Sequence, residues 1–290
     1  MKYEFIHAHR SSFAVKKMCQ VLDVSRSGYY DWRYRSESQR SRDNRALVRA
    51  IKDVHDKSDK TYGSPRITVA LHYRGFSCSR PRVARLMSAE GIKAKTKKKH
   101  KVTTNANHSY PVAPNLLGQE FWTNAAHRIW MSDITYISTW EGWLYLTVIL
   151  DLFSRKVVGW SMSNTLQAGD TTIPALMQAV ARYQPLPGVI FHSDRGVQYA
   201  CEDFRGLLDH LHMVQSMSGT GNCYDNAVVE SFFHTLKTEL VYHRAYQSRL
   251  EAKRSLFEYM EVFYNRFRMH SALNYRTPEQ YEQSTINQNI

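Results

Sequence analysis

The sequence predicts an α/β fold, a mixed five-stranded sheet with flanking helices, preceded by small all-α units. Strand-like runs with short turns between them come first in the second half, at 133–139, 143–151 and 156–162. Helix-like and strand-like runs then alternate, at 167–183, 189–192, 202–212 and 213–217. The first third of the chain instead carries apolar residues at helical spacing. Pattern alone leaves α/β and α+β open.

Composition indicates a folded chain with an uneven charge distribution. It has 290 residues, 43% of them hydrophobic, which is enough to bury a core. Of the net charge of +13, residues 1–110 hold 25 Lys/Arg against 9 Asp/Glu, whereas residues 111–290 hold 14 against 17. A basic nucleic-acid binder joined to a near-neutral enzyme fits this distribution, although a solvated basic surface gives the same count.

Several sequence features predict a cytoplasmic setting with no membrane partner. The four cysteines are scattered and form no C-x-x-C pair or disulfide framework. The first residues lack the apolar stretch of a signal peptide, and the longest apolar run, 143–150, is too short to span a bilayer. No segment has the basic amphipathic pattern of a membrane-surface helix.

Residues 1–40 read as a short helix-turn-helix-like segment. Helices are expected at 14–22 and 25–33, the second capped by Ser25, and the polar residues 36–43 are interpreted as a linker. The aromatic residues of the second helix either support a DNA contact or form the apolar face of a small helical hairpin.

Residues 44–95 carry a clearer helix-turn-helix-like pattern. An apolar stripe marks 44–55, Pro65 starts a helix over 66–73, and a third helix begins near Ser79. In such motifs one helix enters the major groove of DNA, so the start of the third helix is expected to contact it. The expected contacts are Arg80, Arg82 and Arg85, and the alternative is that they are solvated helix-face arginines.

A basic stretch separates this unit from the sheet region. Six lysines lie between residues 93 and 101, followed by residues without periodicity to about 118. We interpret 96–120 as a basic linker whose lysines also follow the phosphate backbone of DNA. The lysines expected to do so are Lys97, Lys98 and Lys99.

Three carboxylates have contexts suited to a metal site. Asp133 opens a strand-like run, Asp194 follows the short apolar run at 189–191, and Glu230 lies in a helix-like run. An isolated aspartate is most often a surface residue, so the combination carries the prediction. Converging carboxylates repel one another and are neutralised by magnesium or manganese. Two such ions about 4 Å apart stabilise the attacking and leaving oxygens of a phosphodiester displacement.

The motifs around these carboxylates carry a resemblance. WMSDITY (130–136), HSDRGVQY (192–199) and DNAVVESFF (225–233) resemble the catalytic core of the insertion-sequence-three family of bacterial transposases, which is related to retroviral integrases. The resemblance extends over nearly the whole chain and is closest to the product of the second reading frame, OrfB. It implies a ribonuclease-H-like catalytic core at 121–245, and the predicted order of strands and helices agrees with that fold.

The resemblance also implies an activity and its partners. It implies a DNA transposase in which Asp133, Asp194 and Glu230 bind two Mg²⁺ ions, or Mn²⁺ in their place, and activate water or a 3′-hydroxyl to attack DNA. The expected partners are insertion-sequence ends, target DNA and further copies of the chain assembled on DNA, where it would be nucleoid-associated. The upstream reading-frame product is a further expected partner, because it usually supplies a leucine zipper that this sequence lacks.

The helix bearing Glu230 has further candidate residues. Lys237 lies two turns later on the same face and is expected to hold a DNA phosphate, the alternative being an exposed lysine. Asn226 is expected to cap the helix rather than to orient the substrate strand. The Gly-rich stretch 218–224 is interpreted as a mobile active-site loop.

The end of the chain, 246–290, is expected to form a helical extension. A long helix is predicted over 250–266 and a last short turn or helix from Thr277. Aromatic and basic residues interleave at 264–270, and this stretch either contacts DNA or packs on the core.

Two rival functions remain open at this stage. One is a DNA-binding regulator whose carboxylates are structural remnants. The other is a ribonuclease-H-like nuclease, or an integrase, without transposition of its own. A regulator would bind DNA without metal-dependent chemistry. A nuclease would leave cut DNA strands, whereas a transposase would leave joined ones.

Overall fold

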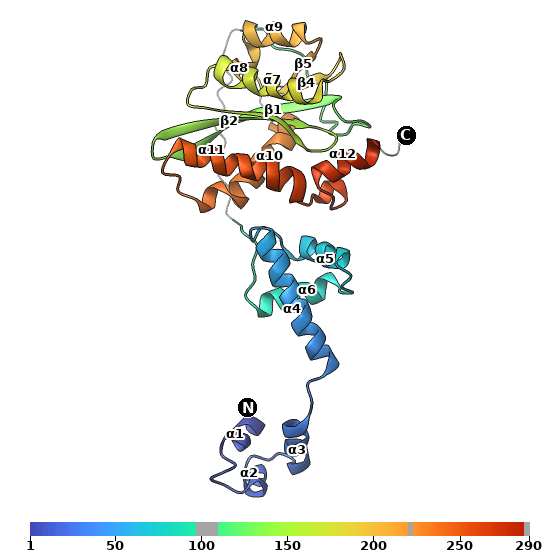
Figure 1. Cartoon of the computed structure of the whole chain (residues 1–290), viewed down its shortest axis with the longest axis vertical. Helices are drawn as coiled ribbons and strands as arrows, with labels where there is room; N and C mark the ends of the chain where they lie inside the picture. The colour runs from blue at the N-terminus through green and yellow to red at the C-terminus, as the bar shows by residue number, and fades with distance from the viewer. Residues whose placement is uncertain (97–109, 220–222, 287–290) are drawn as a thin grey trace.

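The computed structural model describes residues 1–96, 110–219 and 223–286, which form two helical units and a sheet-containing core (Figure 1). The predicted contacts Lys97, Lys98 and Lys99 lie outside these ranges. In the described ranges, no helix combines the length and the apolar character needed to cross a bilayer.

The core is built on a mixed five-stranded sheet with the order β3-β2-β1-β4-β5. β1 (Ile129–Thr139), β2 (Gly142–Asp151) and β3 (Val157–Ser163) form an antiparallel meander, and β4 (Ile190–Ser193) and β5 (Val214–Met217) run parallel to β1. The predicted α/β class and ribonuclease-H-like order are confirmed. β1 starts four residues before the predicted run, because its first residues pair with β4.

Helices cover both faces of the sheet (Figure 1). One face carries α7 (Thr172–Tyr183), α8 (Val197–Ala200) and α9 (Glu202–His210). The other carries α10 (Ala227–Glu239), α11 (Arg249–Phe257) and a π-helix (Glu258–Phe267) that continues α11, followed by α12 (Pro278–Ile286). Pro174 sits in the first turn of α7, where its missing N–H costs no helical hydrogen bond.

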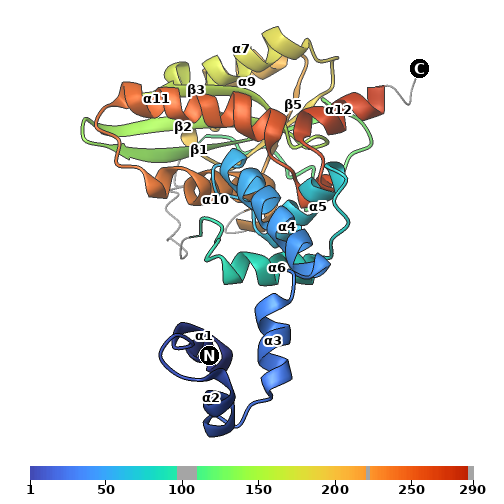
Figure 2. The same cartoon turned by 60° about the horizontal axis from the view of Figure 1, so that its bottom comes forward.

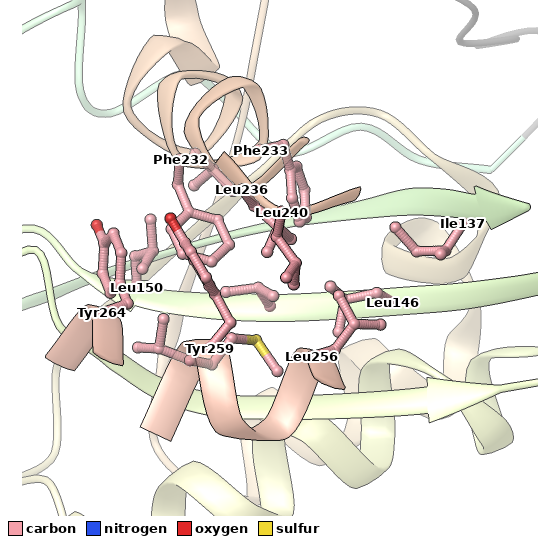
Figure 3. Close-up of a cluster of buried hydrophobic side chains, with 14 of the residues drawn as sticks. Ile137, Leu146, Leu150, Phe232, Phe233, Leu236, Leu240, Leu256, Tyr259 and Tyr264 are labelled. Carbon is pink, nitrogen blue, oxygen red and sulfur yellow. The ribbon is translucent and has the colours of Figure 1, made fainter. Parts of the chain in front are cut away.

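Alternation along β1 decides which residues face α10. Trp130 packs with the cluster under α7 and α9, whereas Met131 and Ile137 pack with α10 and α11. Figure 3 shows Ile137 in this second cluster. Side chains two residues apart point to the same face of a strand. Asp133 therefore faces α10.

The π-helix covers part of the outer edge of the sheet. β3 is an edge strand, and the buried side chain of Asn265 lies against it. Asn265 Oδ1 accepts from the N–H of Val157 at 2.9 Å, and its Nδ2 donates to the Val157 carbonyl at 3.0 Å. The amide therefore bonds to β3 as a neighbouring strand would.

The first helical unit contains α1 (Lys2–Ala8), α2 (Val15–Val21) and α3 (Arg26–Tyr34). The helix α1 was not among the predicted elements, and its Ile6 is fully buried against the other two helices. The predicted cap is confirmed, since Ser25 Oγ accepts from the N–H of Gly28. Tyr29 is buried in this cluster, which supports the apolar-face interpretation for that residue.

The second helical unit contains α4 (Gln39–Lys57), α5 (Ser64–Tyr73) and α6 (Arg80–Ala89), packed around one apolar cluster. The prediction of a linker over 36–43 is wrong for its second half, because α4 already begins at Gln39. Ser38 caps it by accepting from the N–H of Ser41, and Gln39 bonds to Asp43 one turn later.

The second helical unit lies on the α10 side of the core (Figure 2). The Tyr62 hydroxyl donates to the Phe267 carbonyl at 2.9 Å and accepts from the N–H of Met269 at 2.8 Å. Tyr264 and Arg268 are buried in the same region. These contacts support packing, rather than DNA contact, for the aromatic and basic stretch 264–270.

Gly159 marks the closest approach of β3 to α7 and gives a test of the fold. A Cβ at this position would lie 2.5 Å from the Ala175 carbonyl oxygen and 2.8 Å from Ala179 Cβ. We predict that Gly159→Ala lowers the free energy of unfolding by about 1–3 kcal/mol, because α7 must move away. Urea denaturation of the full chain measures this change.

The matched control is Gly206→Ala in α9, where no atom of the described residues lies within 4 Å of the added Cβ. Alanine should there preserve the stability or raise it by up to about 1 kcal/mol, because it favours the helix. Equal losses at both glycines would contradict the close packing of α7 on β3.

Candidate active site

Asp133 is fixed near the middle of β1. It stands opposite Val148 of β2, and its half-buried side chain faces α10. Its Oδ1 accepts from the N–H of Ile134 at 2.7 Å, which limits the rotation of the carboxylate. The strand therefore supplies the first carboxylate in a defined orientation.

Asp194 follows β4 directly and comes to lie beside Asp133. The last pair in the parallel register is Ser132 with Ser193, so the next residue of each chain segment is an aspartate on the same face. Asp194 Oδ1 accepts from the N–H of Gly196 at 2.9 Å. A Cβ at Gly196 would lie 3.0 Å from that oxygen, so a residue without a side chain suits this turn.

Glu230 reaches the two aspartates from the first turn of α10. Val229, Phe232 and Leu236 are buried between α10 and the sheet, and Glu230 lies exposed on a flank of the helix. The pKa of Glu230 is raised by partial burial and by the charge of Asp194. Glu230 and Asp194 are distant in the sequence, but in the fold they are close enough for the charge of one to act on the other.

The three carboxylates share one electrostatic environment. Burial raises the pKa of Asp133 well above its ordinary value, and the charges of Asp194 and Glu230 raise it further. Like charges that raise one another's pKa favour a bound cation, and carboxylate oxygens are the hard donors that suit Mg²⁺. The donor set therefore fits a divalent metal.

The carboxylates do not form a closed metal cage in this arrangement. In the described part of the chain, no three His, Cys, Asp or Glu side chains lie close enough to hold one ion as placed. What the structure brings together is two neighbouring aspartates at one face of the sheet, with Glu230 of α10 close enough for its charge to raise the pKa of Asp133.

Lys237 brings a positive charge to the same cluster. It is half-buried on α10, two turns after Glu230. Burial lowers the pKa of its ammonium group, whereas the charge of Asp133 opposes this shift. The prediction that Lys237 shares the face of Glu230 agrees with this proximity.

Asn226 plays a different structural part from the one predicted. It occupies the N-cap position of α10, but its side chain makes no capping hydrogen bond there, so the capping interpretation is wrong. Its Nδ2 donates instead to the Ser132 carbonyl at 3.3 Å, which ties α10 to β1 beside Asp133. Its Oδ1 is buried and has no hydrogen-bond partner within the described residues.

Asp225 links the start of α10 to the segment before the sheet and was missed from the sequence. Its carboxylate is buried and accepts hydrogen bonds from Asn115, Gln119 and the N–H of Gly219. The pKa of the neighbouring His192 is lowered by burial to about 4, so this imidazole is neutral at pH 7. Only its position beside Asn226 could have drawn attention to Asp225.

The predicted DNA contacts on α6 differ in their environments. Arg80 and Arg85 are exposed. Arg82 is half-buried, and its Nε and Nη2 donate to Asn44 Oδ1 at 3.0 and 2.8 Å. Arg82 thus ties α6 to α4, and the exposed pair remains available to a partner.

Comparison with known proteins agrees with this arrangement. Residues 123–223 and 230–286 match two family models, each described as an integrase core domain, and residues 41–100 match an HTH-like domain. The chain is 40% identical over 288 residues to Transposase InsF for insertion sequence IS3A of Escherichia coli (strain K12), which covers 99% of this chain and all of the relative. The chain belongs to the IS3 family of transposases.

A second relative also matches over most of its length. The transposase described here is 42% identical over 261 residues to the "Insertion element IS600 uncharacterized 31 kDa protein" of Shigella sonnei, and the match covers 90% of this chain and 96% of the relative. As a member of the family, the transposase is a polynucleotidyl transferase that acts in DNA transposition and integration.

Solved structures similar to the transposase include two viral assemblies. The simian T-cell lymphotropic virus intasome in complex with PP2A regulatory subunit B56 gamma has a TM-score of 0.47 at 18% identity, covering 80% of this chain and 74% of that chain. The HTLV-2 integrase catalytic core domain in complex with magnesium has a TM-score of 0.41 at 18% identity, and the match covers 55% of this chain and 97% of that chain.

Repulsion among the three carboxylates should lower the free energy of unfolding of the chain, and removing one charge measures this effect. We predict that Asp194→Asn raises the free energy of unfolding by about 1 kcal/mol in the presence of a chelator, because one of three converging charges is removed. The asparagine oxygen can still accept from the N–H of Gly196. Chemical denaturation of wild type and variant in EDTA gives the difference.

Asp203→Asn in α9 is the control for this experiment. Asp203 is an exposed acid in the first turn of its helix, where a carboxylate is mildly stabilising. Its substitution should lower the stability slightly. A loss of stability for Asp194→Asn would show that the three carboxylates do not repel one another in the folded chain.

Proposed function

We propose that Asp133, Asp194 and Glu230 are the catalytic carboxylates of this transposase and that they bind two Mg²⁺ ions, for which Mn²⁺ can substitute. The observation that carries this proposal is the parallel register that sets Asp133 of β1 beside Asp194 at the end of β4, with Glu230 in the first turn of α10, the helix that Asp133 faces. The bond from Asn226 Nδ2 to the Ser132 carbonyl supports the proposal, because it ties the start of α10 to the residue before Asp133.

The reaction proposed is an exchange of phosphodiester bonds in DNA. Water, or a 3′-hydroxyl oxygen, forms a new bond to phosphorus as the bond from phosphorus to the leaving 3′-oxygen breaks. The attacking oxygen loses its proton and the leaving oxygen gains one. Bound magnesium stabilises the negative charge on both oxygens.

The residues of the chain have separate parts in this reaction. Asp133 and Asp194 are held by backbone N–H groups, so their geometry is set before DNA binds. Glu230 is exposed and faces the incoming strand. Lys237 holds a non-bridging phosphate oxygen close to the carboxylates, because an ammonium group binds phosphate as a point charge. No covalent bond between protein and DNA is needed.

The DNA contacts proposed outside the core lie in the basic part of the chain. Arg80 and Arg85 of α6 face the major groove, and Arg82 orients α6 through its bonds to Asn44. The lysines at 97–99 follow the phosphate backbone. The transposase acts on insertion-sequence ends and target DNA in the bacterial cytoplasm, with further copies of itself and with the upstream reading-frame product.

Strand transfer on labelled element-end DNA tests the catalytic assignment. We predict joined DNA strands with Mg²⁺ or Mn²⁺ and none with EDTA, and a loss of product of at least about 100-fold for Glu230→Gln or Asp194→Asn. A denaturing gel separates joined strands from cut ones. The control Asp203→Asn should retain wild-type yield.

The outcomes of this assay separate the rival functions. Normal strand transfer by Asp194→Asn would show that the carboxylate assignment is wrong. Cut but unjoined strands would favour a nuclease. If neither this chain nor its fusion to the upstream product reacts, but both bind DNA specifically, the regulator function would be favoured.

The contacts of α6 are tested by DNA binding in EDTA. We predict that Arg85→Gln weakens the binding of element-end duplex by about 1–3 kcal/mol, because a charged contact to DNA is lost. Arg74→Gln is the control, since Arg74 already pairs with Asp53 on the same helical unit. Fluorescence anisotropy measures both affinities, and equal affinities would remove Arg85 from the DNA interface.

A further inference from the structure

A groove runs along α10 between the core and the second helical unit. It consists of two cavities, of about 380 and 400 Å³, that share Arg66, Thr235 and Ser271 in their walls. Arg66 comes from α5, Thr235 from α10 and Ser271 from the segment after the π-helix. We call this feature the α10 groove.

Positive charge converges on the first cavity. Arg66, Arg155 and Arg268 line it together with His270. Burial lowers the pKa of His270 to about 2, and the charges of all three arginines lower it too. Three guanidinium groups from distant parts of the chain therefore lie near one point.

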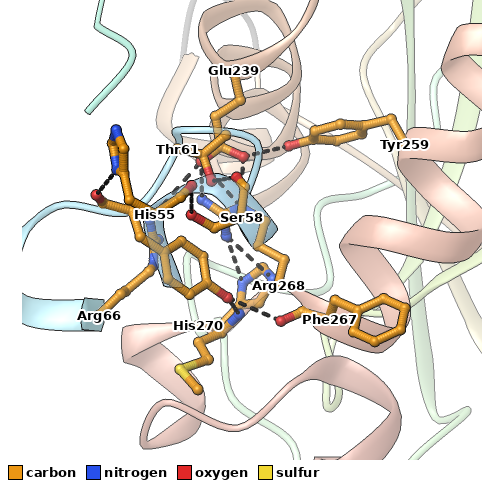
Figure 4. Close-up of polar contacts among 11 residues, drawn as sticks. His55, Ser58, Thr61, Arg66, Glu239, Tyr259, Phe267, Arg268 and His270 are labelled. Carbon is orange, nitrogen blue, oxygen red and sulfur yellow. Dashed lines mark hydrogen bonds and ion pairs between the residues drawn. The ribbon is translucent and has the colours of Figure 1, made fainter. Parts of the chain in front are cut away.

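One of these charges is neutralised within the protein. Arg268 donates from Nη2 to Glu239 Oε1 at 2.7 Å and from Nε to Oε2 at 2.9 Å, and both side chains are buried (Figure 4). The Tyr259 hydroxyl donates to the same carboxylate at 2.8 Å. The oxygens of Glu239 are thus engaged, and Arg66 lies farther away, at 3.9 Å.

Arg155 is left with unused hydrogen-bond donors. In the described residues its side chain makes one hydrogen bond, from Nη2 to the Phe121 carbonyl, at 3.0 Å. The nearby carboxylate of Asp151 accepts instead from His127 and Ser154. A guanidinium group has five N–H donors, so Arg155, like Arg66, can still bind an anion.

The opposite wall of the groove belongs to the helix that carries Glu230. Ser231 and Thr235 are one turn apart and contribute hydroxyl groups to this wall. Successive residues of an α-helix are rotated by about 100°, so Ser231 and Thr235 lie roughly 100° and 140° around the helix axis from Glu230. The groove therefore follows the helix that carries Glu230, on a different side of it.

We propose that the α10 groove binds backbone phosphates of the DNA strand that enters the carboxylate cluster, with Arg66 and Arg155 as the anion-binding groups. Arginine matches phosphate oxygens with paired N–H donors, and hydroxyl groups donate to the same oxygens. This inference deepens the proposed function, because it rests on the reacting strand lying at Asp133, Asp194 and Glu230.

Such a site joins the two parts of the transposase. Arg66 belongs to the second helical unit and Arg155 to the turn between β2 and β3 of the core. A phosphate held by both forms a bridge across their interface. DNA bound in the groove thereby fixes the helical unit against the helix that carries Glu230.

The test is a matched pair of substitutions at Thr235, which lines both cavities. Thr235→Glu and Thr235→Gln have the same size, and only the first adds a negative charge facing the arginines. We expect Thr235→Glu to bind labelled element-end DNA about tenfold more weakly than Thr235→Gln. The slope of affinity against salt concentration should fall by about one unit for Thr235→Glu.

The measurement uses the full chain in EDTA, and thermal unfolding confirms that both variants fold. In an Arg66→Gln background the difference between the two Thr235 variants should shrink, because the added charge acts through Arg66. Equal affinities of Thr235→Glu and Thr235→Gln would overturn the proposal. So would a glutamate effect that Arg66→Gln leaves unchanged.

Inorganic phosphate separates DNA from a free anion as the ligand. If phosphate raises the melting temperature of wild type but not of Thr235→Glu, while both bind DNA equally, the groove takes free phosphate and the DNA proposal is wrong. DNA binding in EDTA does not depend on catalysis, so the two proposals can fail separately. A normal strand-transfer yield for Asp194→Asn would refute the catalytic assignment, whereas the binding affinities of the Thr235 variants would still test the α10 groove.

Discussion

The structure depends on four parallel backbone pairs between β1 and β4. They place Asp133 and Asp194 next to each other on one face of the sheet, an arrangement that electrostatics alone disfavours. Only a rigid scaffold keeps such charges together, and the antiparallel partner β2 supplies much of that rigidity along the whole of β1. The surrounding features compensate for the repulsion: Lys237 approaches from α10, and backbone N–H groups bind one oxygen of each aspartate.

The helix α10 is held from two sides, and this explains how one element can serve both the carboxylate cluster and the helical unit. Its apolar side packs on the sheet, while Glu239 near its end forms a buried ion pair with Arg268. A buried pair of this kind contributes little net stability, but its loss leaves an uncompensated charge, so it fixes geometry more than it adds free energy. Tyr62 and Arg66 meet the core in the same region, so the position of α10 and the docking of the second helical unit are physically linked.

Most of the fold and the three candidate carboxylates could be predicted from the sequence, because both produce local sequence patterns. Strand and helix periodicity predicted the order of strands and helices along the chain, and the three motifs, with their family resemblance, singled out the acids. The first residues of β1 were missed because their partner, β4, is distant in the chain, and the start of α4 was missed because polar residues give no apolar period. The bond from Asn226 to Ser132 and the meeting of Arg66, Arg155 and Arg268 depend on tertiary packing, which no local pattern records.

Asn265 has a consequence for the behaviour of the chain in a crowded cell. The outer edge of a sheet presents unpaired N–H and C=O groups, which can recruit a strand from another molecule. The amide of Asn265 bonds to both backbone groups of Val157 and so occupies part of that edge. A side-chain amide offers no backbone of its own with which a further strand could pair. A single side chain on the π-helix thus reduces the tendency of the folded chain to aggregate through β3, without lengthening the sheet.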